Sequence, residues 1–341
     1  DTATSGAGRA GNVTINTGTL EASSVNQQFN FISTGTLGEG NGGDVTITAA
    51  HVQLQNTTIN TGDAFARSLF QEASGSAGNL TITADSLQLN NAGLDTAAFS
   101  AFADSQQAGD ITLNVRDINM NSGAISAIGV DRGGAITVNA DRLVTDFTIF
   151  ESVTVSGPGR GITINARAVE LTNGSTLVST TFGDGNAGDI SVTATDHLSL
   201  IGHADGQNPL GLEQPTGLYS NSFGEFGSQG NAGNIVVITP RLEMTVGSRI
   251  TAATASSGHG GNVAINADTI SISGEFPNPG ALEDTIWDIK PLAPSGVFST
   301  TVGSDFCSGP CGNAGHISIT TRSLVMDGGA QIDSSTSNNG R

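Results

Sequence analysis

Gly78-Asn79-Leu80-Thr81-Ile82-Thr83-Ala84-Asp85-Ser86-Leu87-Gln88-Leu89-Asn90-Asn91-Ala92-Gly93-Leu94-Asp95-Thr96 is the stretch that decides the fold. Its apolar residues alternate with polar ones in Leu80-x-Ile82 and Leu87-x-Leu89, and Leu94 follows before small polar residues. This period of two predicts three short strands, each with one buried face. The corners at Ala84-Asp85 and Asn91-Ala92-Gly93 are too short for a helix. Such a unit cannot bury its own apolar face, so it needs copies of itself on both sides.

The chain supplies these copies, most of them 25 to 35 residues apart and two of them 45 and 54 residues long. In most copies the leading strand follows Gly-Asn or Gly-Asp, as in Gly11-Asn12 and Gly43-Asp44. Glycine there is expected to permit a tight corner with positive φ, and Asn or Asp to satisfy local backbone groups. The first apolar residue of the leading strand recurs at Val13, Val45, Leu80, Ile111, Ile136, Ile162, Ile190, Ile235, Val263 and Ile317.

The second and third strands recur in the same way. The second appears as Val52-x-Leu54 or Leu198-x-Leu200, and the third as one apolar residue before small polar ones, as in Ile125-Ser126. The copies at Leu20 and from Leu143 to Val155 fit these two strands less cleanly. Polar side chains share one position after the leading strand and predict a structural ladder of amides and hydroxyls: Asn16, Asn114, Asn139, Asn165 and Asn266, with Thr48, Thr83, Thr193, Thr239 and Thr320 in the other copies.

Repeats of this length with three strands and no helix predict a solenoid. We therefore expect an all-β chain that forms one continuous right-handed parallel β-helix over residues 1–341, with about ten three-strand coils and a length of about 45–50 Å. The surplus residues of the two long copies predict insertions on one edge, at about 203–215 and 275–294. Solenoids commonly place binding surfaces in such insertions.

Composition and charge limit the functions that the chain can have. The chain has 341 residues, 47 of them glycine, and a formal net charge of −19. Such an acidic surface should repel nucleic acid and anionic lipid, and no apolar run is long enough for membrane insertion. The dispersed acidic residues indicate a solvated surface, with a calcium-loaded surface as the alternative. Cys307 and Cys311 predict a small disulfide loop typical of an oxidising compartment, with free thiols or metal binding as alternatives.

The repeats Gly42 to Ala49 and Gly185 to Ala194 resemble those of filamentous haemagglutinin-like exoproteins, in the style of cyanobacterial members. The resemblance covers essentially the whole chain. It implies a surface-associated right-handed β-helix, secreted with the help of an outer-membrane transporter and used as an adhesin stalk or fibre. The Asn-Pro-Asn-type motif of the family's secretion domain is absent from this sequence, and the family has no active-site residues to carry over.

Candidate chemistry is sparse. Gly258-His259-Gly260 matches one element of the pectin-hydrolase signature, but the companion Asn-Thr-Asp and Asp-Asp elements are missing. Paired carboxylates for hydrolysis are not marked either, so we expect no enzyme, with a polysaccharide-active enzyme as a remote alternative. No cofactor is expected, because calcium binding has no motif here. An aromatic contact patch for glycan or protein is one interpretation of four side chains that could also pack back onto the rod: Tyr219, Phe223, Phe226 and Trp287.

These features together predict a structural and adhesive role. We expect a stiff stalk segment of a secreted or cell-surface fibrous protein, whose partners are a host or neighbouring cell surface or a glycan. The alternative is a self-assembling filament or sheath subunit, because the chain begins near Asp1 and ends near Asp333 to Arg341 at the same phase of the repeat and carries no recognisable cap. Open ends of a β-solenoid are prone to pair with further strands, so the partner would then be a second copy stacked end to end.

Overall fold

The fold is all-β, as the sequence predicts. The computed structural model describes residues 7–24, 30–35, 38–62, 75–98, 106–202, 215–223, 229–275, 294–302 and 312–337. Within these ranges the regular structure consists of strands alone. The strands form one hydrogen-bonded sheet, and its ladders are parallel throughout.

Most leading and second strands are continuous rather than separate. The chain turns the first corner of the repeat while it stays paired with its neighbours, and in β5 and β6 it continues through all three predicted segments. These continuous strands are β1 (Val13–Ser23), β3 (Val45–Gln55), β5 (Leu80–Asp95), β6 (Ile111–Gly129), β9 (Ile162–Thr172), β11 (Ile190–Ile201), β13 (Ile235–Thr245), β15 (Val263–Ser273) and β18 (Ile317–Asp327). In one repeat the leading strand, β7 (Ile136–Asn139), is separate from β8 (Arg142–Thr154), which forms the second and third sides.

The third side of the repeat is formed by the ends of β5, β6 and β8 and by short strands. These short strands pair only with the equivalent segments of neighbouring repeats. They are β2 (Asn30–Ser33), β4 (Thr57–Asn60), β10 (Thr176–Thr181), β12 (Gly217–Ser222), β14 (Arg249–Thr254), β16 (Gly296–Phe298), β17 (Thr301–Val302), β19 (Gln331–Asp333) and β20 (Thr336–Ser337).

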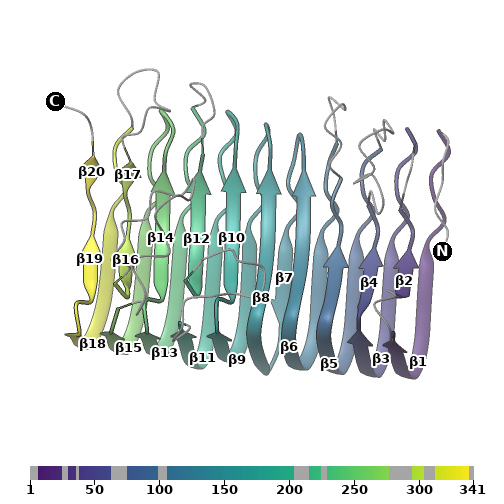
Figure 1. The fold of residues 1–341 in the computed structure, drawn as a ribbon, viewed down its shortest axis with the longest axis horizontal. Coiled ribbons are helices and arrows are strands. Elements are labelled where there is room, and N and C mark those ends of the chain that lie inside the picture. The colour runs from purple at the N-terminus through teal and green to yellow at the C-terminus, as the bar shows by residue number, and fades with distance from the viewer. Residues whose placement is uncertain are drawn as a thin grey trace.

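The pairing register confirms the predicted phase of the repeat. Val13 lies opposite Val45, Val45 opposite Leu80, and the same pairing continues through every predicted copy to Ile317. The copies that fit less cleanly are also in register, since Leu20 pairs with Val52 and Leu143 with Ile118 and Val169. Figure 1 shows the repeats side by side in chain order, from β1 at one end to β18 at the other.

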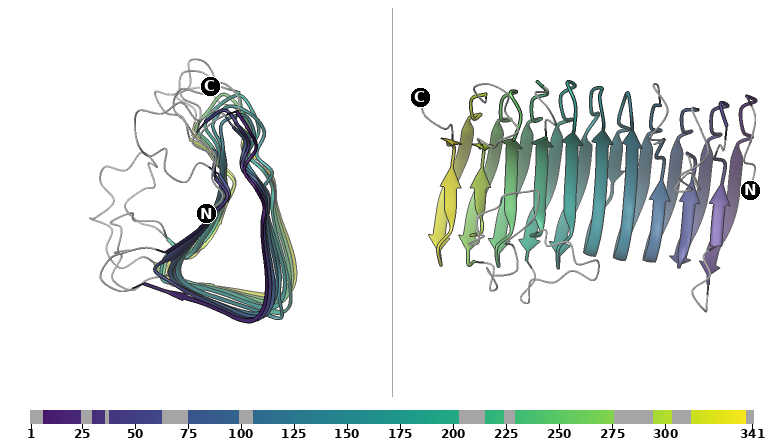
Figure 2. Two further views of the ribbon diagram at one scale, coloured as in Figure 1. Left: turned by 90° about the vertical axis from the view of Figure 1, so that its right-hand side faces the viewer. Right: turned by 45° about the horizontal axis from the view of Figure 1, so that its top comes forward.

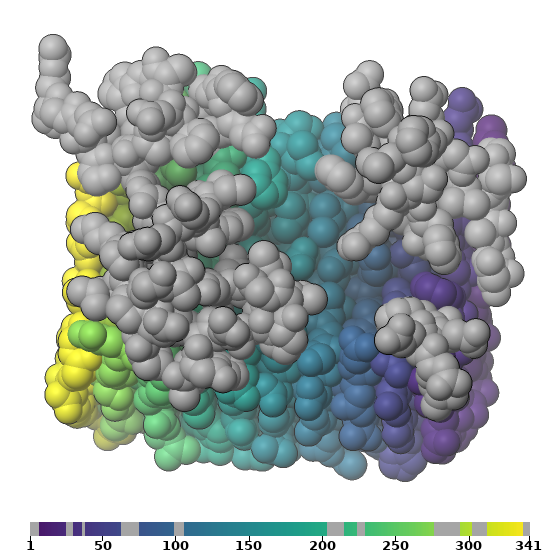
Figure 3. Space-filling view, viewed as in Figure 1, coloured from purple at the N-terminus to yellow at the C-terminus, as the bar shows by residue number. Residues whose placement is uncertain are grey.

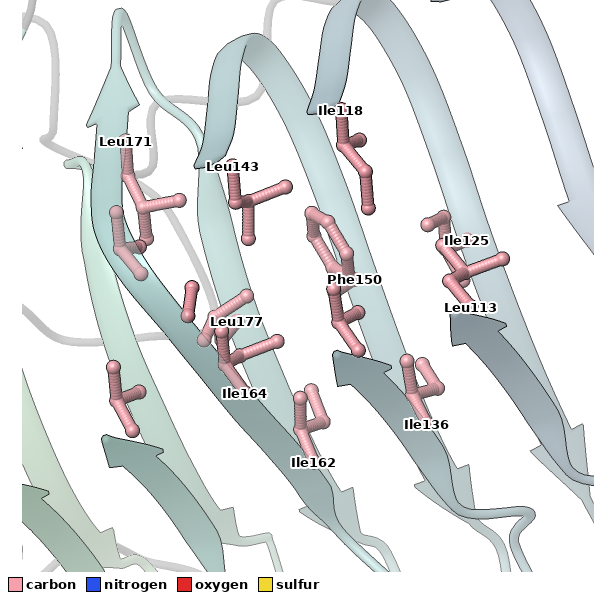
Figure 4. Packing of buried hydrophobic residues seen from close by; sticks show 14 of the residues in the cluster. Leu113, Ile118, Ile125, Ile136, Leu143, Phe150, Ile162, Ile164, Leu171 and Leu177 are labelled. Carbon is pink, nitrogen blue, oxygen red and sulfur yellow. The ribbon is translucent and has the colours of Figure 1, made fainter. Parts of the chain in front are cut away.

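Viewed along this stack, successive repeats superimpose on one near-triangular outline (Figure 2). The apolar residues of all three sides point into it, as Ile136, Leu143 and Phe150 do in Figure 4. These side chains are fully buried, and each stacks on the equivalent residue of the next repeat. The core is therefore a set of aliphatic columns, with Phe150 as the aromatic member between Ile125 and Leu177.

In most repeats glycine precedes the leading strand for a reason that differs from the predicted one, although Gly161, directly before Ile162, has the predicted positive φ (+80°). Gly43, Gly78 and Gly109 do not have positive φ. Instead, a Cβ built on Gly78 would lie 2.0 Å from the carbonyl oxygen of Gly43, and one on Gly109 would lie 1.8 Å from that of Gly78. Real Cβ atoms do not approach that closely, so glycine is required by the spacing between successive repeats.

In several repeats a buried hydroxyl at the end of the third strand hydrogen-bonds to the glycine before the next leading strand. The Thr61 hydroxyl donates to the Gly78 carbonyl at 2.6 Å, while the Gly78 N–H donates to the Thr61 carbonyl at 3.0 Å. Ser220 also bonds to the next glycine, but as an acceptor: its Oγ accepts from the Gly233 N–H at 2.9 Å and donates to the Gly188 carbonyl of the preceding repeat at 3.1 Å. The small polar residues after the apolar residue of the third strand therefore fasten the end of one repeat to the start of the next.

The second corner of the repeat uses the left-handed backbone region. Asn91 has φ +47°, and most of the residues aligned with it have positive φ as well, including Asn173 and Val246. Asparagine tolerates this region better than most residues, whereas β-branched valine is unusual there. In three of the described repeats a glycine with positive φ follows (Gly174, Gly247 and Gly329) and completes a tight two-residue turn.

The predicted polar ladder lies on the outer surface. Asn165 Nδ2 donates to Asn139 Oδ1 at 3.0 Å, and Asn139 Nδ2 donates to Asn114 Oδ1 at 2.9 Å. One assignment was wrong: Ile238, which is 46% exposed, occupies this position, and Thr239 lies one residue further on. The pattern misled because Ile238 presents an apolar side chain to solvent.

The two predicted insertions leave the repeats between the second and third strands. One lies between β11 and β12, and the other between Glu275 and Pro294, which form an antiparallel bridge at its base. Residues 203–214 and 276–293 themselves lie outside the described residues. On the face seen in Figure 3, the described repeats follow one another in chain order as adjacent bands.

Candidate ligand-binding strip

The outer faces of β10, β12, β14 and β16 form a strip unlike the rest of the surface. On these strands the core residues Leu177, Leu218, Ile250 and Val297 alternate with residues that point the other way. Yet most outward residues are also buried. We call this set the outer strip: Thr176, Val178 and Thr180 on β10, Gly217, Tyr219 and Asn221 on β12, Arg249, Thr251 and Ala253 on β14, and Gly296 and Phe298 on β16.

Arg249 is the centre of the outer strip. It lies between Gly217 and Gly296, its partners on the neighbouring strands. A Cβ built on Gly217 would be 3.0 Å from the Tyr219 ring, and one on Gly296 would be 2.7 Å from the Phe298 ring, so each ring folds over the glycine of its own strand. The Arg249 guanidinium carbon lies 5.0 Å from the centroid of the Phe298 ring, within cation–π range. The guanidinium is thus flanked by aromatic rings.

Burial changes the ionisation of both polar groups. Arg249 is only 9% exposed, and desolvation lowers the pKa of its guanidinium. Desolvation raises the pKa of the Tyr219 phenol, while the positive charge of Arg249 acts in the opposite direction. The Tyr219 hydroxyl donates to the Pro215 carbonyl at 2.7 Å, so the phenol is held in place as a neutral donor.

Several polar atoms of the outer strip have no hydrogen-bond partner among the described residues. They are Thr176 Oγ1, Thr180 Oγ1, Asn221 Oδ1, Arg249 Nε and Thr251 Oγ1. Buried polar groups are nearly always paired, because an unpaired one loses its bonds to water without replacement. Five such atoms on three adjacent strands mark this strip as the candidate site.

The aromatic residues predicted from sequence are only partly in this strip. Tyr219 belongs to it and is buried, so it packs against the strands, which was the other interpretation of the pattern. Phe223 is half-buried and stands 6.1 Å from Phe182, ring centroid to ring centroid. Phe226 and Trp287 lie outside the described residues, as do Cys307 and Cys311 with their predicted disulfide. A binding role for these aromatics stays a prediction.

Sequence reasoning missed Arg249 and Phe298 as site residues. Both were visible as neighbours of the apolar residue in a third strand, in Arg249-Ile250 and Val297-Phe298. Alternation about Ile250 and Val297 would have placed both side chains on the outer face. Their burial could not be read in this way, because outward residues of the other strands are mostly solvated.

Two other surface groups that could suggest a site, Arg167 and His259, already have partners within the chain. A shallow depression beside Ala140 and Thr193 is lined by Arg167, whose guanidinium pairs with Asp141 at 3.1 Å and Asp196 at 3.0 Å. His259 from the pectin-hydrolase match is exposed, and its Nδ1 accepts from the Asn313 N–H at 3.0 Å.

Searches of the described ranges for membrane helices and metal sites gave no candidates. No helix there has the length and apolar character needed to span a bilayer. No group of three or more His, Cys, Asp or Glu in the described part of the chain could hold a metal ion. Comparison with protein-family models, curated proteins and solved structures gives no match for this chain.

Proposed function

We propose that this chain is a right-handed parallel β-helix of about ten three-strand coils that serves as a stiff stalk segment of a secreted or cell-surface fibrous protein. The observation that carries the proposal is the unbroken register of the leading strand from Val13 to Ile317. When the chain winds so that equivalent strands pair in parallel, each repeat adds length to the rod and contacts only the repeats next to it. Such a rod transmits force along its axis without any hinge between domains.

The role is structural and adhesive rather than catalytic in this proposal. The acidic side chains of the leading corner already accept backbone and side-chain hydrogen bonds: Asp44 accepts from Asn79, and Asp110 from Ala135 and Arg160. The resemblance to filamentous haemagglutinin-like exoproteins supports an extracellular location, export through an outer-membrane transporter, and contact with a cell surface or glycan. We propose no cofactor.

A second candidate is a filament subunit that stacks end to end. In β18, Leu324 and Met326 are 42% and 39% exposed, although their partners Ile270 and Ile272 in β15 are buried. Further strands paired to β18 would bury them, and either a second copy or more coils of a longer chain could supply those strands. In the stacking proposal, a second copy of the chain supplies these strands.

Negative-stain microscopy combined with sedimentation velocity tests both proposals on the purified chain. Rods of one length, about 45–50 Å, support the stalk segment. Filaments that lengthen with protein concentration, and that are lost in Leu324→Lys but kept in the outward-facing control Thr320→Lys, support stacking. A compact particle that sediments as a sphere would overturn the rod and with it both candidates.

A further inference from the structure

We propose that the outer strip binds a carbohydrate that carries an isolated carboxylate, with Arg249 as the anchor for that carboxylate. The proposal goes beyond the stalk function, since a rod needs no ligand. The basis is an imbalance: Arg249 is nine-tenths buried, its Nε has no hydrogen-bond partner, and none of the ion pairs among the described residues includes it. An unpaired buried charge is costly unless something neutralises it.

The shape of the guanidinium defines the group that fits. Arginine presents a planar fork of N–H donors that matches the two oxygens of a carboxylate. In this site the cation is held in one orientation, with the Phe298 ring 5.0 Å away and the Tyr219 ring over the preceding repeat. A carboxylate that reaches this fork binds without ordering a long flexible side chain first.

The neighbours of Arg249 indicate a carbohydrate rather than an acidic peptide. Thr176, Thr180 and Thr251 contribute hydroxyls that lack partners and can both donate and accept, and Asn221 contributes an unpaired Oδ1 that accepts. The unpaired groups lie on three adjacent parallel strands. Thr180 and Asn221 are partners on neighbouring strands, about 4.8 Å apart along the stack, and Thr176 and Arg249 share another row two strands apart. A ligand with hydroxyls along its length and an apolar ring face for Tyr219 or Phe298 meets these requirements.

The charge of the chain limits how acidic this ligand can be. The formal net charge is −19, and a densely charged polyanion would be repelled by the surrounding surface. Within the outer strip Arg249 is the one charged residue. One carboxylate among neutral sugars therefore fits better than a polymer with a charge on every unit.

The test uses a disaccharide of glucuronic acid linked to a neutral sugar, and the same disaccharide with its carboxyl group reduced to an alcohol. Isothermal titration of the full chain should detect the acidic form, with affinity at least about tenfold weaker for the reduced form and for Arg249→Met. Arg241→Met is the matched control, because Arg241 is an exposed arginine on the neighbouring β13 and its loss should leave affinity unchanged. Equal affinity for both forms, equal loss in both variants, or no binding of the acidic form would overturn the proposal.

The melting temperature of the ligand-free variants supplies an independent reading. Arg249→Met removes a desolvated charge and keeps a side chain of similar length, so an unpaired guanidinium predicts a melting temperature that is unchanged or higher. A fall of several degrees, with Arg241→Met unaffected, would mean that a counter-ion within the chain already holds Arg249, and the site would then be structural. Neither outcome depends on whether the chain forms a rod, so failure here is distinguishable from failure of the stalk proposal.

Discussion

Asp189 Oδ1 accepts two hydrogen bonds from Asn234, one from its backbone N–H at 2.7 Å and one from its Nδ2 at 3.2 Å. Asn234 Oδ1 in turn accepts from the backbone N–H and Nδ2 of Asn262, both at 3.0 Å. The same arrangement joins Asp44 to Asn79. Where Asp and Asn alternate from one repeat to the next at this position, each carboxylate therefore lies beside a neutral amide rather than beside another carboxylate.

We expect Asn234→Asp to destabilise the chain by about 1–2 kcal/mol at pH 7, because it removes a charge-assisted donor and places two carboxylates in contact. Urea unfolding of the variant and of the unsubstituted chain at pH 7 measures it. Asn266→Asp is the matched control, since its partners Ile238 and Thr320 carry no charge. Equal effects of the two substitutions would contradict the role of the Asp189 contact.

Gly78→Ala should destabilise the chain by about 1–3 kcal/mol or more, because the new methyl group would collide with the Gly43 carbonyl. Gly18→Ala, where a Cβ meets nothing within 4 Å, should be neutral or slightly stabilising. Thermal unfolding followed by circular dichroism compares the two. Similar melting temperatures would show that the spacing between repeats can expand to accept the methyl group.

Val246→Asn should raise stability by about 1 kcal/mol, since Val246 holds φ +54° at a position where several aligned repeats have Asn or Gly. Val246 is only half-buried, so little apolar contact is lost. The control is Val236→Asn, a half-buried outward residue of β13 outside the positive-φ positions, which should lose stability. A loss in both variants would mean that packing, rather than backbone strain, dominates at Val246.

Phe150→Ala should cost about 3–5 kcal/mol, because it opens a cavity in a fully buried column between Ile125 and Leu177. Hydrogen exchange should show the largest loss of protection in the repeats that contact β8, since repeats of this kind interact with their neighbours only. Phe182→Ala, at a 38% exposed ring, should change stability by less than half as much. Uniform loss of protection along the chain would contradict nearest-neighbour coupling.

Removal of calcium should not alter the melting temperature by more than about 1 °C. The carboxylates of Asp44 and Asp110 accept hydrogen bonds from backbone N–H groups and from the guanidinium groups of Arg9 and Arg160. Their oxygens would have to give up these donors to bind calcium. Differential scanning fluorimetry with a chelator and with millimolar calcium measures this. A rise of several degrees on adding calcium would show that ion binding contributes to the fold.

The phase of the repeat was predictable because the apolar residues of the leading and second strands alternate clearly. The third strand was harder, since Ile32 follows Phe31 and Phe150 follows Ile149, so alternation does not say which of the two is buried. The pairing register places Ile32, Ile59 and Phe150 in one column. The glycine before each leading strand was recognised but misexplained. Its cause is a contact between residues about thirty positions apart, which local turn chemistry does not contain.

The candidate site was less predictable than the fold. Alternation places Tyr219, Arg249 and Phe298 on an outer face, but their burial depends on what packs there in three dimensions. The role of the two glycines beside Arg249 is visible only when β12, β14 and β16 are aligned. Each glycine leaves room for an aromatic ring from its own strand. Arrangements made across repeats leave no local signature in sequence.

The glycine column has a consequence for how such a chain can change during evolution. At most glycines before a leading strand an added Cβ would collide with the carbonyl of the equivalent glycine in the repeat before, so a side chain introduced in one repeat must be accommodated by its neighbour. Residues between the second and third strands are under no such constraint, and it is there that the chain has grown by a dozen residues or more without shifting the register on either side. New recognition surfaces can therefore be gained and lost at one edge while the spacing of the repeats stays fixed.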